Sequence, residues 1–161
     1  MKELAQPDPL ATALTLLDCI TGRNGAAESI EELAKHIDAF MYSVHSLRPC
    51  AAPLGRIVDD EPPDTTDDHW RSIIGPRYPM LGFYWNAVSS RIVASKEPQI
   101  GTGDAIDDLI DISRELAAVE WHLHYHGRSE ALEALRWCYK VHLYMHLVYL
   151  RTHLEELIYS P

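Results

Sequence analysis

The chain has 161 residues, of which 47% are hydrophobic and 24% are charged, and its formal charge is -10. This length and composition suit one globular domain spanning residues 1–161, which at this size buries roughly 70% of its unfolded surface. The negative charge argues against a protein that binds a nucleic-acid backbone through clustered lysines and arginines. No apolar run approaches the ~18 residues of a membrane span, and no secretory leader or CxxC pair is present. We therefore expect a cytoplasmic protein that contacts neither nucleic acid nor membrane.

Helical patterns fill the first third of the chain. The segment Leu10–Ile20 is apolar and follows Asp8-Pro9, a pair typical of a helix cap and first turn. A second helix is predicted from Ser29 to Leu47, with Ser29 as its cap. The proline-rich and acidic stretch at about 49–68 then predicts a loop.

The rest of the chain also predicts helices. A short turn is expected over Asp68–Ile74, then helices over Met80–Val93, Gly103–His126 and Ser129–Tyr159. Gly101-Thr102-Gly103 is interpreted as the start of the second of these helices, and no segment alternates like a strand. The predicted fold class is therefore all-α, an antiparallel bundle of about five or six helices.

Acidic residues form a stripe along the helix that begins near Gly103. Asp104, Asp107, Asp108 and Asp111 recur at i, i+3, i+4 and i+7, and Glu115 continues the stripe by one turn. Like charges on adjacent turns repel by a few tenths of a kcal/mol per pair, roughly. The stripe is therefore either a solvated face or the oxygen half of a cation site.

The last helix places polar residues along one side of an apolar element. His142, His146, Tyr149 and His153 lie at i, i+4, i+7 and i+11, and the first two have the spacing of a shared metal site. Two such histidines can equally be hydrogen-bonded core residues. The Glu-x-x-His pair of di-iron bundles is absent from the chain.

The turn near Gly127 sets the register between these two helices. Because the turn is short the helices must pack antiparallel, which places His142 level with about residue 113 and His146 level with about residue 109. The histidines then lie beside the aspartate stripe. The candidate metal set comprises Asp104, Asp108, Asp111, His142 and His146. Supporting candidates are Asp107, Glu115, Arg77, Tyr84 and Tyr149.

Three motifs are similar to an uncharacterised bacterial helical family, the domain-of-unknown-function 5063 family. They are the segments 77–84 (RYPMLGFY), 103–112 (GDAIDDLIDI) and 142–146 (HLYMH). The family pattern has Trp-Gly where this chain has Leu143-Tyr144. The resemblance implies an α-helical, cytosolic bacterial protein whose aspartates and two histidines form one set, and it implies no activity. A weaker resemblance, through Glu31-Glu32 and Asp104-x-x-Asp107, is to all-α nucleotide pyrophosphohydrolases that hold Mg²⁺.

Two functions fit the sequence. The first is a non-enzymatic interaction or regulatory module, with a protein partner or a second copy of the chain, in which the Asp/His set is a buried polar network. The second is a hydrolase that acts on a small phosphorylated or nucleotide substrate with Zn²⁺, Mn²⁺ or Fe²⁺ held by the candidate set. The acidity and the lack of a nucleophile motif favour the first by a small margin, and no cofactor is certain.

Overall fold

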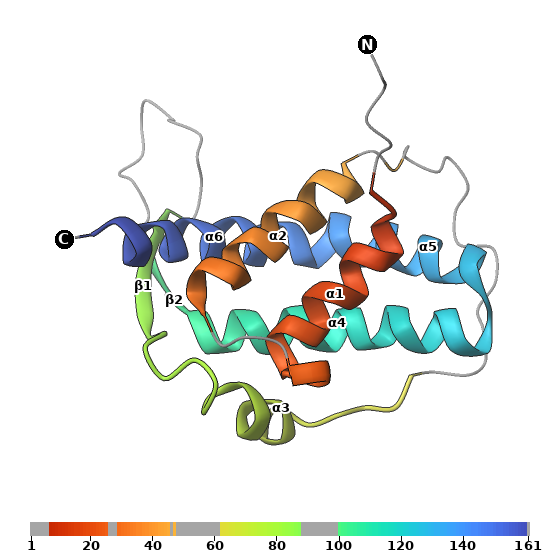
Figure 1. Cartoon of the computed structure of the whole chain (residues 1–161), viewed down its shortest axis with the longest axis horizontal. Coiled ribbons are helices and arrows are strands. Elements are labelled where there is room, and N and C mark those ends of the chain that lie inside the picture. The colour runs from red at the N-terminus through yellow and green to blue at the C-terminus, as the bar shows by residue number, and fades with distance from the viewer. Residues whose placement is uncertain (1–6, 26–28, 46, 48–61, 88–99, 161) are drawn as a thin grey trace, which may run out of the picture.

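A computed structural model describes residues 7–25, 29–45, 47, 62–87 and 100–160. Most of these residues are helical, as predicted, and they form a bundle with one small two-stranded sheet (Figure 1). The α-helices are α1 (Pro9–Thr21), α2 (Ile30–Val44), α3 (Asp67–Ile74), α4 (Ala105–Tyr125), α5 (Arg128–Cys138) and α6 (Tyr144–Tyr159). The short elements are the 3₁₀ turn η1 (Arg23–Gly25), the strands β1 (Phe83–Ala87) and β2 (Ile100–Asp104), and the π-helical turn η2 (Tyr139–Leu143).

Side-chain caps explain where the helices begin. Asp8 accepts a hydrogen bond from the Leu10 amide before α1, and Ser29 accepts one from the Glu32 amide before α2. Asp104 does the same for α4 by accepting from the Ile106 amide at 2.9 Å. These contacts satisfy amides that have no partner within the helix. They confirm the predicted starts of α1 and α2 and move the start of α4 two residues beyond Gly103.

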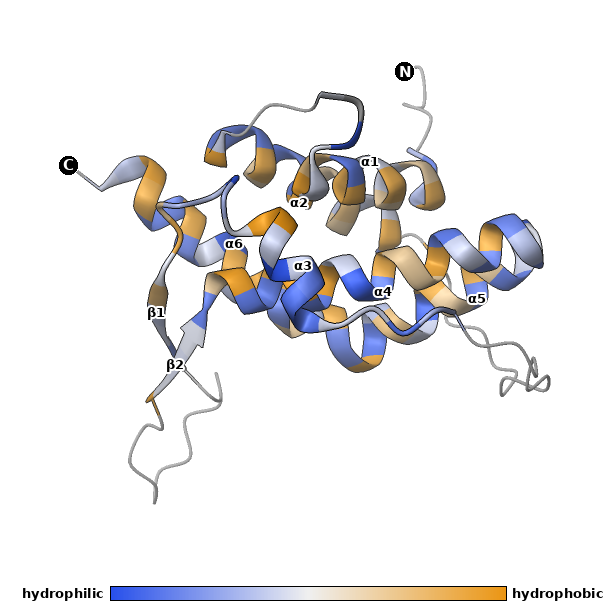
Figure 2. Cartoon of the chain, turned by 90° about the horizontal axis from the view of Figure 1, so that it is seen from below, coloured by the Kyte–Doolittle hydropathy of each residue, from blue (hydrophilic) through white to orange (hydrophobic). Residues whose placement is uncertain are grey.

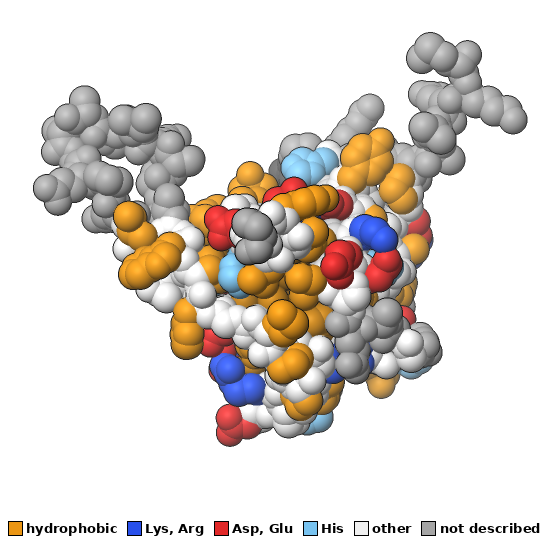
Figure 3. All heavy atoms as spheres, turned by 60° about the vertical axis from the view of Figure 1, so that its left-hand side comes forward, with side chains coloured by type: hydrophobic (Ala, Val, Ile, Leu, Met, Phe, Trp, Pro, Cys, Tyr) orange, Lys and Arg blue, Asp and Glu red, His pale blue; other side chains and the backbone are white. Residues whose placement is uncertain are grey.

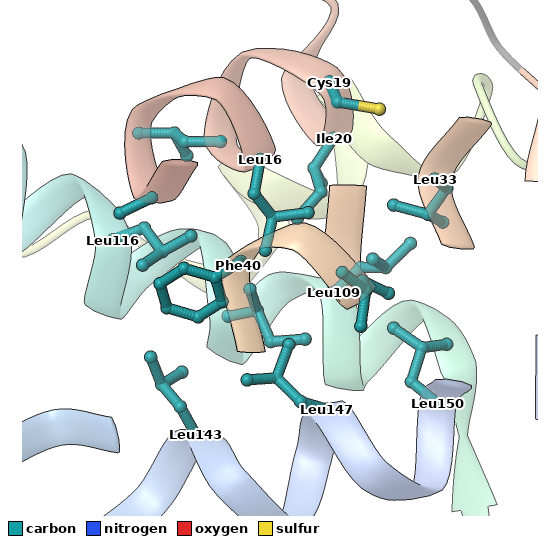
Figure 4. Packing of buried hydrophobic residues seen from close by; sticks show 14 of the residues in the cluster. Leu16, Cys19, Ile20, Leu33, Phe40, Leu109, Leu116, Leu143, Leu147 and Leu150 are labelled. Atoms are coloured by element: carbon teal, nitrogen blue, oxygen red, sulfur yellow. The ribbon is translucent and has the colours of Figure 1, made fainter. Parts of the chain in front are cut away.

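The helices form two layers around one apolar core. The pair α1 and α2 lies across α4 and the continuous run of α5, η2 and α6, and α3 packs against α4 (Figures 1 and 2). Leucines and isoleucines from both layers meet around Phe40, which is fully buried (Figure 4). Leu109 of α4 and Leu147 of α6 are fully buried in the same cluster. This packing fixes the rotation of α4 and α6, and so decides which of their polar residues face each other.

The helix predicted over Met80–Val93 is wrong for the residues described there. Residues 83–87 form β1, which pairs antiparallel with β2, and Tyr84 lies opposite Gly103. Three consecutive aromatic residues favour a pleated strand, while the two glycines of β2 disfavour a helix. Gly103 also has a steric role, because a Cβ there would overlap the Tyr84 ring. Residues 88–93 of the predicted helix, and 49–61 of the predicted loop, lie outside the described residues.

The hairpin has one face on the bundle and one in solvent. Tyr84 is buried, whereas Phe83 and Trp85 on either side of it are 75% and 78% exposed. Figure 3 shows hydrophobic side chains at the surface of this end of the molecule. Alternation between buried and exposed positions is the signature of a strand with one packed face.

The single helix predicted over Ser129–Tyr159 contains an irregularity. The helical run is continuous, but η2 interrupts it between α5 and α6 with π-type geometry. A π-turn admits an extra residue into a helix and often lies at a functional site. Here it contains His142, one of the two predicted metal-ligating histidines. None of the helices among the described residues is long and apolar enough to cross a membrane.

We expect Asp8→Ala to lower the free energy of unfolding by about 1–2 kcal/mol, and Asp8→Asn by less. Asp8 caps α1 and also forms a two-pronged pair with Arg128 at 2.8 and 3.0 Å, which joins α1 to the start of α5. Alanine removes the cap and the pair, whereas asparagine keeps the cap and loses an exposed pair. Denaturant unfolding of both variants measures the difference.

The direction of the pKa shift of Asp8 determines how the stabilisation by the Asp8–Arg128 pair depends on pH. The Arg128 hydrogen bond lowers the pKa of Asp8 below its usual 3.8. The stabilisation from the pair is therefore present above pH 3.8 and is lost as the pH falls below 3.8 through the folded-state pKa. The stability gap between the wild type and Asp8→Asn should shrink at the acid end. A gap that is unchanged by acid would contradict this role of the pair.

Candidate metal centre

The site lies where α4 runs antiparallel to η2 and α6. Asp108, Asp111 and Glu115 of α4 face His142 of η2 and His146 of α6. The Nδ1 atom of His146 is 2.7 Å from Asp108 Oδ1, and that of His142 is 2.9 Å from Glu115 Oε1. The register predicted from the Gly127 turn is thereby confirmed to within about two residues.

The two imidazoles converge through their other nitrogens. The Nε2 atoms of His142 and His146 are 3.1 Å apart, and Asp111 Oδ2 is 3.7 Å from His146 Nε2. One ligand atom from each of these three residues lies within 4.8 Å of the other two. Ligand atoms around a divalent ion, each about 2.0–2.2 Å from it, are themselves roughly 3–3.5 Å apart. The two Nε2 atoms have this spacing, and Asp111 Oδ2, at 3.7 Å from His146 Nε2, lies slightly beyond it.

Glu115 and Asp108, which face the Nδ1 atoms of His142 and His146, determine which ring nitrogen carries the proton. An ionised carboxylate only accepts hydrogen bonds, so each Nδ1 that faces one carries the proton and donates it. When both rings are neutral, each Nε2 then presents a lone pair, and the two lone pairs point at each other. Two arrangements relieve this repulsion: a metal ion bound by both nitrogens, or a proton on one of them. Carboxylates behind metal-bound imidazoles are a common feature of metal sites.

The electrostatics of the site favour a positive charge at its centre. The hydrogen bond that His146 donates to Asp108 raises the pKa of His146, so the site favours its cationic form. Burial raises the pKa of Asp111, since its charged form loses water on folding. A bound cation would offset this cost. The side chains of Asp111, His142 and His146 are between 25% and 40% exposed, so an ion and a small ligand can reach them from solvent.

The β-hairpin supplies a second layer of contacts. Tyr84 donates a hydrogen bond from its hydroxyl to Asp108 Oδ2, while the other oxygen of the carboxylate bonds to His146. Burial and the Asp108 carboxylate raise the pKa of Tyr84. The Tyr84 ring stacks on His153 at 4.8 Å between centroids. Because the hairpin holds Tyr84 and Tyr84 holds Asp108, the orientation of His146 depends on a segment that is distant in the sequence.

Arg114 orients the remaining ligand. Its guanidinium donates to Asp111 Oδ1 at 3.2 Å and also pairs with Asp67 of α3. The second carboxylate oxygen of Asp111 is thereby turned toward His146. Each of the three candidate ligands is therefore held by a second charged residue.

The structure assigns other positions to several predicted site residues. Asp104 is the N-cap of α4, and Asp107 is exposed and pairs with Arg71. Arg77 donates to the carbonyls of Ile20 and Cys19 at the end of α1, away from the histidines. Among the described residues, the group with metal-ligand spacing is Asp111, His142 and His146.

Three supporting candidates and one further residue, His153, complete the surroundings of the site. Glu115 contacts His142 and Tyr84 contacts Asp108. Tyr149 is half-buried against the core and close enough to Tyr84 to raise its pKa. The stacking of His153 on Tyr84 is a contact that sequence reasoning missed, although His153 follows His142 and Tyr149 on the same helix stripe. The helical spacing of His153 from His142 and Tyr149 could have indicated that it lies near the site.

Comparisons with known proteins do not identify this chain. No family model, curated protein or solved structure matches it. The resemblance to the domain-of-unknown-function 5063 family therefore stays a prediction.

Proposed function

We propose that the protein is a divalent-metal-dependent hydrolase of a small phosphorylated substrate, with the ion held by Asp111, His142 and His146. The observation that supports this most strongly is the convergence of two imidazole Nε2 atoms at 3.1 Å, each backed by a carboxylate on its Nδ1. One ion bound by both nitrogens satisfies this pair, as a proton on one of them also would. A three-residue site also leaves coordination positions open for water and substrate.

The ligand chemistry narrows the choice of ion. Two imidazoles and one carboxylate suit Zn²⁺, Mn²⁺ or Fe²⁺, whereas Ca²⁺ and Mg²⁺ prefer oxygen ligands. Such an ion supplies an activated water near neutral pH and neutralises charge on a phosphoryl group. The chain's own contribution is to hold the ligands: Glu115 and Asp108 keep both Nδ1 atoms protonated, and Arg114 orients Asp111. The acidic helical chain remains, on this proposal, a cytoplasmic bacterial protein.

A surface feature favours a second function, the interaction module. Trp137, Val141, Tyr144 and Met145 are all 43–56% exposed and lie at helical spacing along α5, η2 and α6. An exposed apolar stripe of this kind is typical of a surface that binds another protein or a second copy of the chain. In that case a proton shared by His142 and His146 would take the place of the metal ion.

Metal analysis by mass spectrometry distinguishes the two functions. Untagged protein, purified without chelator, should contain about one equivalent of zinc, manganese or iron, and the His142→Ala/His146→Ala variant should contain almost none. The double variant His69→Ala/His124→Ala is the matched control, because both of its histidines are exposed and lie outside the site. It should retain the metal. Less than about a tenth of an equivalent in the wild type would contradict the proposal and favour the interaction module.

A further inference from the structure

A groove of about 890 Å³ lies beside the candidate metal centre. Its walls come from residues 62–65, from α3 and from the second half of α4. Aromatic side chains supply much of the surface: Trp70 of α3, and Trp121 and Tyr125 of α4. The Trp121 and Tyr125 rings are 5.2 Å apart between centroids, so they form one continuous aromatic wall. A wall of this kind fits a flat ring that can stack on it.

Trp70 lines the groove with its ring, while its N–H group is buried. Its side chain is well buried, since the residue is only 6% exposed, yet the indole Nε1 has no hydrogen-bond partner among the described residues. A buried donor without an acceptor costs roughly 1–3 kcal/mol. Because this atom is itself closed to solvent, a molecule in the groove meets the Trp70 ring and not its N–H group.

The groove lining carries two arginines and three carboxylates: Arg23 and Arg114, with Asp64, Glu115 and Glu120. Arg23 donates to both oxygens of Glu120 at 2.7 and 2.9 Å, and Arg114 is shared by Asp67 and Asp111. Each guanidinium has five N–H groups, so both retain donors after these contacts. The lining therefore offers donors and acceptors together, with aromatic faces beside them. That combination fits a heteroaromatic ring bearing both amino and carbonyl or ring-nitrogen groups better than it fits a bare polyanion or an aliphatic chain.

The groove leads to the metal centre through two residues. Glu115 lines the groove and also bonds to His142, and Arg114 lines it and also bonds to Asp111. A ring in the groove would thus place a substituent near the candidate ligands. Phosphate is the substituent that both arginine N–H groups and a metal ion bind well.

We propose that this groove binds the nucleobase of a nucleoside monophosphate, with the phosphate directed toward Arg114 and the metal centre. The placement of the phosphate rests on the proposed hydrolase function. The binding of the base does not, because the aromatic walls and Trp70 are independent of the histidines. Adenosine therefore tests the groove alone, and adenosine 5′-monophosphate tests the groove and the metal centre together.

Isothermal titration of the untagged full chain with both compounds, with and without zinc, provides the test. We expect both to bind, and zinc to strengthen binding of the monophosphate only. Trp121→Ala should weaken adenosine binding about tenfold or more through lost stacking. Trp137→Ala, a change on the exposed stripe of α5, is the matched control and should bind as the wild type does.

The outcomes separate the two proposals. If His142→Ala/His146→Ala loses zinc and still binds adenosine, both proposals stand. If the wild type binds no metal but does bind adenosine through Trp121, only the hydrolase proposal fails. The groove proposal is overturned if metal-loaded, folded protein binds neither compound, or if Trp121→Ala and Trp137→Ala bind equally well. Tighter binding of spermidine than of adenosine would overturn it in favour of an organic cation.

Discussion

Asp108→Ala is expected to lower the free energy of unfolding by about 2–4 kcal/mol, whereas Asp111→Ala on the next turn should cost less than about 1 kcal/mol. Asp108 is 7% exposed and accepts hydrogen bonds from Tyr84 and His146. Alanine would leave the Tyr84 hydroxyl and the His146 Nδ1–H without partners in a largely buried place, at roughly 1–3 kcal/mol each. Denaturant unfolding followed by circular dichroism measures both variants.

Asp111 differs from Asp108 because its side chain lies closer to solvent and because its partial burial disfavours the ionised carboxylate. Its side chain is 27% exposed, and burial raises the pKa of its carboxyl group. Removing it therefore costs little stability, but it removes one of the three candidate ligands. We expect Asp111→Ala to be folded and metal-depleted, and Asp108→Ala to be destabilised.

A double variant isolates the Asp108 contact. Asp108→Ala leaves the Tyr84 hydroxyl without an acceptor, and Tyr84→Phe removes that hydroxyl. The loss of stability in Tyr84→Phe/Asp108→Ala should therefore be smaller than the sum of the losses in the two single variants. Equal midpoints for Asp108→Ala and Asp111→Ala would show that the Tyr84–Asp108–His146 chain does not carry the stability assigned to it.

The pairing of the two site helices could be predicted because local rules determine it. Gly127 has a φ of +89°, which favours glycine and ends α4 within one residue of the predicted end. A short turn forces the next helix to run antiparallel, and a fixed rise of about 1.5 Å per residue then determines which residues face each other. This is why the sequence alone sufficed to place His142 and His146 beside Asp111.

The hairpin and the π-turn could not be predicted in the same way. Tyr84 contacts Asp108 only because β1 pairs with β2, a tertiary contact across a long stretch of chain. The aromatic residues 83–85 favour a strand, but only the pairing with β2 decides between a strand and the helix predicted over residues 80–93. The π-turn at Tyr139–Leu143 has no sequence signature that we recognise, since ordinary helix-forming residues occupy it. Both features affect the site directly, because one orients Asp108 and the other contains His142.

A core residue of the bundle packs against the π-turn. Phe40 of α2 is fully buried, and its ring meets Tyr139 of η2 edge-on at 6.0 Å between centroids. Tyr139 is also in edge contact with His45, at the end of α2, and with Tyr144 of α6. Burial raises the pKa of Tyr139 to about 12, which agrees with its packed position. The contact between α2 and η2 thus fixes the turn that presents His142.

Phe40→Ala is therefore expected to lower the free energy of unfolding by about 3–5 kcal/mol, and Phe40→Leu by about 1.5 kcal/mol or less. The alanine variant loses the buried ring and leaves a cavity beside Tyr139, whereas leucine fills most of that space. The only other phenylalanine, Phe83, is 75% exposed, so Phe83→Ala is the matched control and should change stability by no more than about 0.5 kcal/mol. Denaturant midpoints of the three variants give the comparison.

The same substitution tests whether the core supports the site. If Phe40 holds the π-turn in place, Phe40→Ala should speed amide hydrogen exchange at residues 139–143 more than at residues 150–158, under conditions where the protein stays folded. It should also weaken metal binding relative to Phe40→Leu, because His142 would lose its fixed position. Uniform acceleration along the whole of α6, with unchanged metal affinity, would mean that Phe40 stabilises the bundle without positioning the histidine.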